Sequence, residues 1–277
     1  MPKVLINGVS IYYESHGCGF PLILTYGLGG NTGEWGPQVS DFSKSYHLIL
    51  WDPRGHGQSD SPPEQENYSL SIYAKDLHEL MNHLNIPKAY VGGLSMGGSI
   101  ATRFSLNHPE RVAALLIIDS LSASGVPISP EIRAMREKTI QMAETQGMEA
   151  IAEYAIANNP NIASRARKSP EATKSVREMF LALDPIGYAN AVRALITADS
   201  ITEKLPQIKI PTLLLVGEED PALSAMRLIH DKITSSRLII IPNAGHLSNL
   251  DQPEIFNMEL LRFLTEMDSL NSKGTAK

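Results

Sequence analysis

Short runs of continuously apolar residues recur along the chain, separated by polar or helix-like segments. Continuous apolarity is typical of strands that are covered on both faces, as in a parallel sheet, whereas strict alternation indicates one solvated face. Residues 4–15 differ, because Asn7 and Gly8 separate two strand-like pieces and indicate a hairpin. The continuous runs are residues 21–26, 47–51, 89–92, 112–118, 212–216 and 237–241.

Helical patterns lie between these runs. Apolar residues recur three or four positions apart over residues 70–84, and Ser69 stands before them as a candidate cap. Residues 99–107 and 256–267 suit two further helices, and the polar tail 268–277 is expected to fray. Strands that alternate with helices predict a doubly wound α/β sheet.

One long segment, residues 121–205, contains no convincing strand and has a helical pattern. An insertion of this kind between two sheet strands predicts a helical cap, or lid, over the carboxyl ends of the strands, where open α/β sheets bind ligands. We therefore predict a core formed by residues 1–120 and 206–277, with 121–205 as the cap. The cap's acidic and basic residues balance, and its methionines suit either core packing or pocket lining: Met135, Met142, Met148 and Met179.

Composition narrows the class of protein. The chain has 277 residues and a net charge of −6, which disfavours binding to nucleic acid or to anionic membranes and suits a small-molecule partner. Its single cysteine, Cys18, excludes an internal disulfide. The first residues lack the features of a signal peptide, and no apolar run is long enough to span a bilayer. We expect a cytoplasmic protein, and the sequence leaves a homodimer open.

The stretch 92–98, GGLSMGG, places Ser95 among glycines directly after an apolar run. A flexible glycine-rich turn is one interpretation. The other is a G-x-S-x-G nucleophile elbow, which requires this strand-turn-helix setting. A serine held on a strained turn needs small residues two positions before and after it, because strand and helix approach closely there. Gly93 and Gly97 occupy those positions, so we predict that Ser95 is a nucleophile.

A serine nucleophile needs a base, and the base needs an orienting carboxylate. His246 follows the last apolar run in the stretch NAGH and is the candidate base. Asp220, in GEED after the preceding run, is our choice of acid. Glu218 and Glu219 compete with it, as does Asp119 at the end of the run 112–118.

An oxyanion intermediate needs two preorganised donors. The turn after the nucleophile supplies one, the backbone N–H of Met96. We expect the other from the glycine-rich loop 27–30, with the backbone N–H of Leu28 as our choice.

With these landmarks in order, the chain resembles the α/β-hydrolase superfamily. The stretch 52–59, DPRGHGQS, matches the family's D-x-R-G-x-G-x-S loop, which implies a structural role for His56. The stretch 245–254, GHLSNLDQPE, is similar to the pattern of 3-oxoadipate enol-lactonase-like and non-haem haloperoxidase-like members. The resemblance implies a mostly parallel eight-stranded sheet, a helical cap and the Ser-acid-His order. Ser95 in place of an aspartate disfavours haloalkane dehalogenases and epoxide hydrolases.

One position departs from the family's pattern. Tyr26 stands where the family usually has a histidine before the oxyanion glycine, Gly27. The tyrosine either braces the loop or brings its hydroxyl into the site, so Tyr26 and Gly27 are also candidate pocket residues.

The resemblance and the residues together predict a serine hydrolase that cleaves a small carboxylic ester or lactone, an activity that needs neither metal nor organic cofactor. Two alternatives stay open: a C–C bond hydrolase or perhydrolase with the same residues, and a ligand sensor that retains the fold. A substrate with a free carboxylate would require a cation near the serine, and the candidates are Arg133, Arg136 and Arg193.

Overall fold

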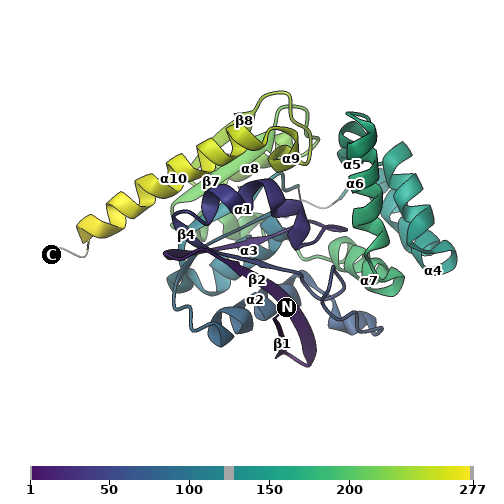
Figure 1. Ribbon diagram of the computed structural model, residues 1–277, viewed down its shortest axis with the longest axis horizontal. Helices are drawn as coiled ribbons and strands as arrows, with labels where there is room; N and C mark the ends of the chain where they lie inside the picture. The colour runs from purple at the N-terminus through teal and green to yellow at the C-terminus, as the bar shows by residue number, and fades with distance from the viewer. Residues whose placement is uncertain (1, 122–127, 275–277) are drawn as a thin grey trace.

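The computed structural model describes residues 2–121 and 128–274, which form an eight-stranded sheet with helices on both faces (Figure 1). The strand order is β1-β2-β4-β3-β5-β6-β7-β8. β1 and β2 run antiparallel to their neighbours, and the other pairs are parallel. The strands are β1 (Lys3–Ile6), β2 (Val9–His16), β3 (Phe20–Thr25), β4 (Tyr46–Trp51), β5 (Ala89–Leu94), β6 (Val112–Ile118), β7 (Thr212–Gly217) and β8 (Ser236–Ile241).

The sheet confirms the predicted fold class, and its packing explains the continuous apolar runs. In β3, Leu22 and Leu24 belong to one buried cluster, whereas Ile23 belongs to the cluster on the opposite face. Both faces of β3 are therefore buried, so every position before Thr25 is apolar. The hairpin between β1 and β2 turns at Asn7 and Gly8, whose φ angles are 48° and 77°, as a two-residue turn of the mirror-image type requires.

Helices flank the sheet on two sides. Residues of α1 (Gly36–Phe42) and α10 (Pro253–Gly274) enter one cluster. Residues of α2, α3 and α8 enter the other. Ser69 caps α2, because its side chain accepts a hydrogen bond from the Ile72 N–H at 3.1 Å. The remaining core helices are α2 (Leu70–His83), α3 (Met96–Asn107), α8 (Leu223–Lys232) and the short α9 (Ser248–Asp251).

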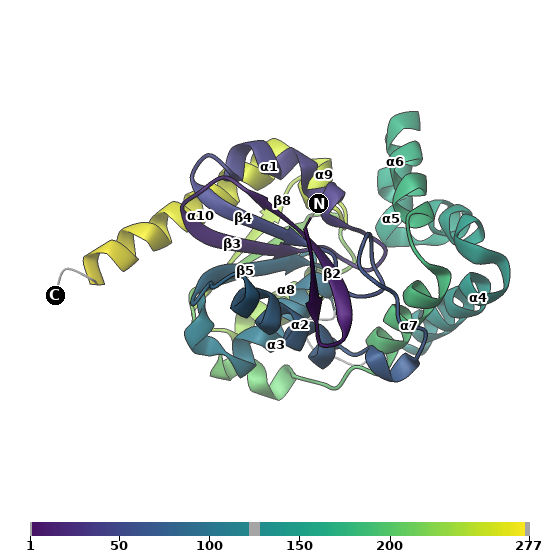
Figure 2. The same cartoon turned by 60° about the horizontal axis from the view of Figure 1, so that its bottom comes forward.

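The insertion between β6 and β7 forms a helical lobe, here called the cap (α4–α7), which lies to one side of the sheet in both views (Figures 1 and 2). Its longest helix, α4, bends at Gly147, whose φ of 79° is not helical. The domain boundaries at 121 and 205 stay a prediction. The cap helices are α4 (Pro130–Asn158), α5 (Pro160–Ala166), α6 (Pro170–Leu181) and α7 (Pro185–Ile196).

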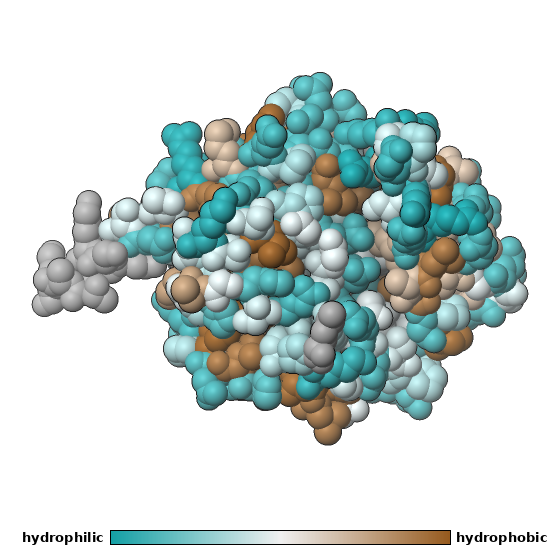
Figure 3. All heavy atoms as spheres, viewed as in Figure 1, coloured by the Kyte–Doolittle hydropathy of each residue, from teal (hydrophilic) through white to brown (hydrophobic). Residues whose placement is uncertain are grey.

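No single helix in the described ranges is long and apolar enough to cross a membrane. The pair α6 and α7 passes that test only when the two are taken together, and they meet at an angle of 94°. On the face shown in Figure 3, hydrophobic residues lie in small groups scattered among hydrophilic ones.

The expected fraying from residue 268 is wrong for the described part of the tail, because α10 continues to Gly274. Asp268 anchors it by accepting hydrogen bonds from the hydroxyls of Tyr46 at 2.8 Å and Tyr90 at 2.6 Å. The rest of that prediction, residues 275–277, lies outside the described residues.

Candidate active site

Ser95 lies on the sharp turn between β5 and α3, with φ of 55° and ψ of −113°. A non-glycine residue rarely adopts positive φ, so this conformation stores strain. Two hydrogen bonds hold it: the Ser95 N–H donates to the Ile118 carbonyl at 2.8 Å, and the Ser120 hydroxyl donates to the Ser95 carbonyl at 2.5 Å. The turn presents the Ser95 side chain at the carboxyl end of the sheet.

The glycines around Ser95 permit this turn. A Cβ added to Gly93 would lie 2.5 Å from the carbonyl carbon of Gly97, and one added to Gly97 would lie 2.1 Å from the Thr25 carbonyl oxygen. Neither distance is sterically allowed. The helix after the turn begins at Met96 rather than at the expected residue 99.

His246 and Asp220 complete a hydrogen-bonded chain with Ser95. His246 Nε2 lies 3.0 Å from Ser95 Oγ, and His246 Nδ1 lies 3.0 and 3.1 Å from the two Asp220 carboxylate oxygens. A carboxylate only accepts hydrogen bonds, so it selects the tautomer with the proton on Nδ1 and leaves Nε2 free to accept the serine proton. The chain forms because β7 and β8 are parallel neighbours and their following loops meet at one edge of the sheet.

The structure separates the competing acids. Glu218 and Glu219 are exposed, whereas Asp220 is 4% exposed. Burial alone would raise the pKa of Asp220, but the charge and hydrogen bond of His246 outweigh it and lower that pKa. Asp119 is fully buried, and the side-chain hydrogen bonds of His246 within the described part of the chain go to Asp220 and Ser95 instead. Burial, followed by the nearby charge of Asp220, raises the pKa of Asp119 well above the usual range.

The glycine-rich loop approaches the serine closely. A Cβ added to Gly27 would lie 2.9 Å from Ser95 Cβ. Leu28, the next residue, lines the same cavity as Ser95 and His246. The roles of the Leu28 and Met96 N–H groups as oxyanion donors stay a prediction.

A cavity of about 170 Å³ lies between the Ser95 turn and the cap. Its lining is mostly apolar, and most of it comes from α4 and from residues near the starts and ends of α5, α6 and α7. Among the methionines, Met135 lines the cavity, whereas Met148 and Met179 belong to the core. The lining includes Leu28, Ser95, Ile132, Met135, Arg136, Thr139, Tyr154, Ile162, Phe180, Tyr188, Pro221 and His246.

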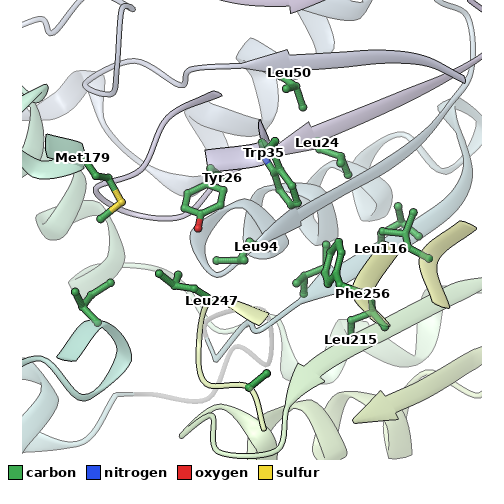
Figure 4. Close-up of a cluster of buried hydrophobic side chains, with 14 of the residues drawn as sticks. Leu24, Tyr26, Trp35, Leu50, Leu94, Leu116, Met179, Leu215, Leu247 and Phe256 are labelled. Carbon is green, nitrogen blue, oxygen red and sulfur yellow. The ribbon is translucent and has the colours of Figure 1, made fainter. Parts of the chain in front are cut away.

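Neither Tyr26 nor Gly27 is among the described residues that line this cavity, and their assignment as pocket residues stays a prediction. Tyr26 is 3% exposed and packs edge-on against Trp35, with ring centroids 5.4 Å apart. Figure 4 shows it in the buried cluster with Leu94 and Leu247. Burial raises the pKa of Tyr26 well above its ordinary value, and its hydroxyl has no hydrogen-bond partner among the described residues. The ring fills core space, so Tyr26 braces the loop.

Residues of the loop 52–59 make hydrogen bonds and an ion pair that hold the loop in the fold. Asp52 accepts hydrogen bonds from the N–H groups of Thr32 at 2.7 Å and Gln58 at 2.9 Å. Arg54 forms a buried ion pair with Asp76 at 2.7 Å. Burial lowers the pKa of His56 to about 4, so this histidine is neutral at pH 7.

The cap is tied to the loop that carries His246. Asp251, whose side chain is 1% exposed, accepts a hydrogen bond from the Gly245 N–H at 2.9 Å. Its other oxygen lies 3.0 Å from Lys168 Nζ and 3.4 Å from Arg165 Nη1, both in or just after α5. One buried carboxylate thereby links the cap to the backbone beside His246.

A mostly parallel eight-stranded sheet, a serine turn after β5 and a helical insertion after β6 define an α/β hydrolase. A family profile described as "alpha/beta hydrolase fold" matches residues 21–253. The chain belongs to this family.

Known relatives cover most of the chain. It is 31% identical over 243 residues to 3-oxoadipate enol-lactonase 1 of Acinetobacter baylyi, covering 85% of each chain. It is 29% identical over 250 residues to a putative 2-succinyl-6-hydroxy-2,4-cyclohexadiene-1-carboxylate synthase of Bacillus subtilis, covering 89% of this chain and 90% of that one. A thermophilic esterase from Thermogutta terrifontis, solved with malate bound, superposes with a TM-score of 0.86 at 30% identity. The match covers 96% of this chain and 98% of the esterase. The lactonase and the esterase support a hydrolase, and the three relatives together leave the substrate open.

Sequence reasoning missed most of the cap residues in the cavity. Tyr154, Phe180 and Tyr188 line it, but no motif marks them. The one available signal is spacing, since Ile132, Met135, Arg136 and Thr139 recur on one face of α4.

Proposed function

We propose that this protein is a serine hydrolase that cleaves a small carboxylic ester or lactone. The observation that carries the proposal is the hydrogen-bonded chain from Ser95 Oγ through His246 to the buried Asp220. Its order along the sequence, serine then acid then histidine, is the order of α/β hydrolases. The similarity to an enol-lactonase and to an esterase supports an ester or lactone bond.

In this mechanism, Ser95 Oγ attacks the substrate carbonyl carbon while His246 Nε2 takes the serine proton. Asp220 holds the imidazole and stabilises its positive charge. The N–H groups of Leu28 and Met96 bind the oxyanion. The tetrahedral intermediate collapses, and His246 returns the proton to the leaving alkoxide. Water then attacks the acyl-enzyme by the same route, which releases the acid and restores Ser95.

The cavity supports a small substrate, since its volume is about 170 Å³. Its apolar lining suits a hydrocarbon chain or ring, and residues of the cap form most of its walls.

The test is steady-state hydrolysis of 4-nitrophenyl acetate by the wild type, by Ser95→Ala and by Ser71→Ala. Ser71 is an exposed serine on α2 that does not line the cavity beside Ser95, and it serves as the matched control. We expect turnover in the wild type and in Ser71→Ala, and its loss in Ser95→Ala with the thermal midpoint unchanged. Near-normal activity of Ser95→Ala would contradict the mechanism.

Labelling by a fluorophosphonate, read by mass spectrometry, separates the alternatives. Labelled Ser95 with ester turnover supports the proposal. Labelled Ser95 without turnover of esters or lactones, but with cleavage of diketones, supports a C–C bond hydrolase. A label without any steady-state turnover supports a ligand sensor.

A further inference from the structure

The structure distinguishes the three cap arginines that the sequence left equivalent. Arg133 is exposed on α4 and does not line the cavity beside Ser95. Arg193 forms an ion pair with Glu144 at 2.6 Å and donates a hydrogen bond to Asn190 at 3.0 Å. It lines a different pocket. Arg136 alone of the three lines the cavity that contains Ser95 and His246.

The Arg136 guanidinium has no counter-charge among the residues that the structure describes. Its Nη1 is buried and lacks a hydrogen-bond partner among the described residues, and no ion pair to Arg136 exists within residues 2–121 and 128–274. None of the described residues that line the cavity is acidic. Burial lowers the pKa of Arg136, yet a guanidinium remains charged at neutral pH. Arg136 as a whole is half-buried, with Nη1 its buried and unpartnered nitrogen. A partly buried cation that lacks a protein partner is costly, so its position beside Ser95 suits an anionic ligand.

We propose that Arg136 binds a free carboxylate of the substrate, so that the enzyme acts on esters or lactones that carry a second, anionic acid group away from the scissile carbonyl. This inference rests on the proposed function and names its substrate class. The planar guanidinium matches a carboxylate with two parallel N–H···O hydrogen bonds, which fix direction as well as charge.

The surroundings of Arg136 suit such a substrate. Ile132 and Met135 precede it on the same face of α4, and Ile162 and Phe180 lie on other walls of the cavity. These apolar side chains would contact the carbon chain that joins the two acid groups. Arg136 on the cap and Ser95 on the core would then hold the two ends of the substrate, which positions the scissile carbonyl.

The first experiment compares 4-nitrophenyl monoesters of glutaric, adipic, pimelic and suberic acids with the same compounds methylated at the free acid. For at least one chain length we expect the wild type to prefer the free acid in kcat/KM by about 10-fold or more. Arg136→Gln should lose this preference and Arg136→Lys should retain part of it. The matched control, Arg133→Gln on the exposed side of α4, should keep the wild-type ratio. A wild type that prefers the methylated esters, or the same ratio in wild type and Arg136→Gln, overturns the proposal.

A binding measurement keeps this inference apart from the proposed function. Glutarate and its longer homologues are titrated calorimetrically into the wild type, Ser95→Ala and Arg136→Gln, each checked for folding by its thermal midpoint. We expect at least one diacid to bind the wild type and Ser95→Ala, and to bind Arg136→Gln about 10-fold or more weakly. Equal affinity in wild type and Arg136→Gln, or no binding of any diacid, contradicts the role of Arg136. Ester hydrolysis that survives in Ser95→Ala contradicts the proposed function instead.

Discussion

Asp119 accepts two hydrogen bonds from Ser248 on one carboxylate oxygen, from the backbone N–H at 3.0 Å and from the hydroxyl at 2.6 Å. Its other oxygen accepts the Gly217 N–H at 2.9 Å. Gly217 ends β7 just before Asp220, and Ser248 follows two residues after His246. Asp119 therefore ties together the two loops whose side chains must meet at Ser95.

Asp119→Asn should weaken the hydrogen bonds that hold these two loops in place. The amide oxygen can still accept from Gly217, but its NH₂ group would face the donor N–H of Ser248. We expect the free energy of unfolding to fall by about 1–3 kcal/mol and kcat to fall between about 10- and 100-fold, because a misplaced base costs rate. Urea unfolding and ester kinetics measure the two effects. Ser248→Ala, which removes only the hydroxyl, should cost less in both, and an Asp119→Asn variant that matches the wild type contradicts this role.

Asp220→Asn tests the choice of acid. An amide cannot stabilise an imidazolium and can favour the wrong tautomer of His246, so we expect kcat to fall by roughly 10³–10⁴ with the fold retained. Glu219→Gln, on the exposed neighbouring residue, is the matched control and should keep the wild-type kcat. If Glu219→Gln lost more activity than Asp220→Asn, the acid would be Glu219.

Tyr26→Phe separates the ring of Tyr26 from its hydroxyl. The hydroxyl is buried without a partner among the described residues, so its removal should leave kcat unchanged and keep or raise stability by up to about 1 kcal/mol. Tyr26→Ala removes the ring that packs on Trp35 and should cost about 3–5 kcal/mol. Kinetics and urea unfolding of the pair distinguish these effects. A large fall in kcat for Tyr26→Phe at full stability would show that the hydroxyl takes part in catalysis.

Local patterns predicted the sheet well, because the apolarity of its central strands, such as β5, β6 and β7, follows from burial on both faces. The run 112–118 matches β6 residue for residue. The start of α3 was misplaced because Gly97 and Gly98 have poor helix propensity, yet their close contacts with Thr25 and Ser120 require glycine. The order of the tail was missed because Asp268 is held by tyrosines of distant strands.

The candidate site was predictable where chain order and loop position determine it, as for Ser95 and His246. The lining of the cavity was not. Which arginine lines it depends on how α4, with Arg133 and Arg136, and α7, with Arg193, are rotated over the core, and helical spacing alone does not fix those rotations. The role of Tyr26 depends on its contact with Trp35, a residue on a separate turn.

Glu34 provides a test of pH dependence, because burial raises the pKa of its carboxyl to about 7 against the opposing charge of Arg165. In the unfolded chain a glutamate titrates near pH 4.3. The folded protein thus binds the Glu34 proton more tightly than the unfolded chain does. By linkage, this contribution to stability is fully present below about pH 4.3 and declines as the pH rises to about 7.

Glu34→Gln replaces the carboxyl with a neutral group that has no proton to lose. Relative to the wild type, this variant should therefore gain stability as the pH rises from about 4 to about 7, by about 3 kcal/mol, and gain little more above that range. Urea unfolding of both proteins across the range measures the difference at each pH. Two curves that stay parallel from acid to neutral pH would show that the carboxyl of Glu34 reaches water in the folded protein. A difference that instead shrinks as the pH rises would show that Arg165 dominates and that Glu34 is ionised in the fold.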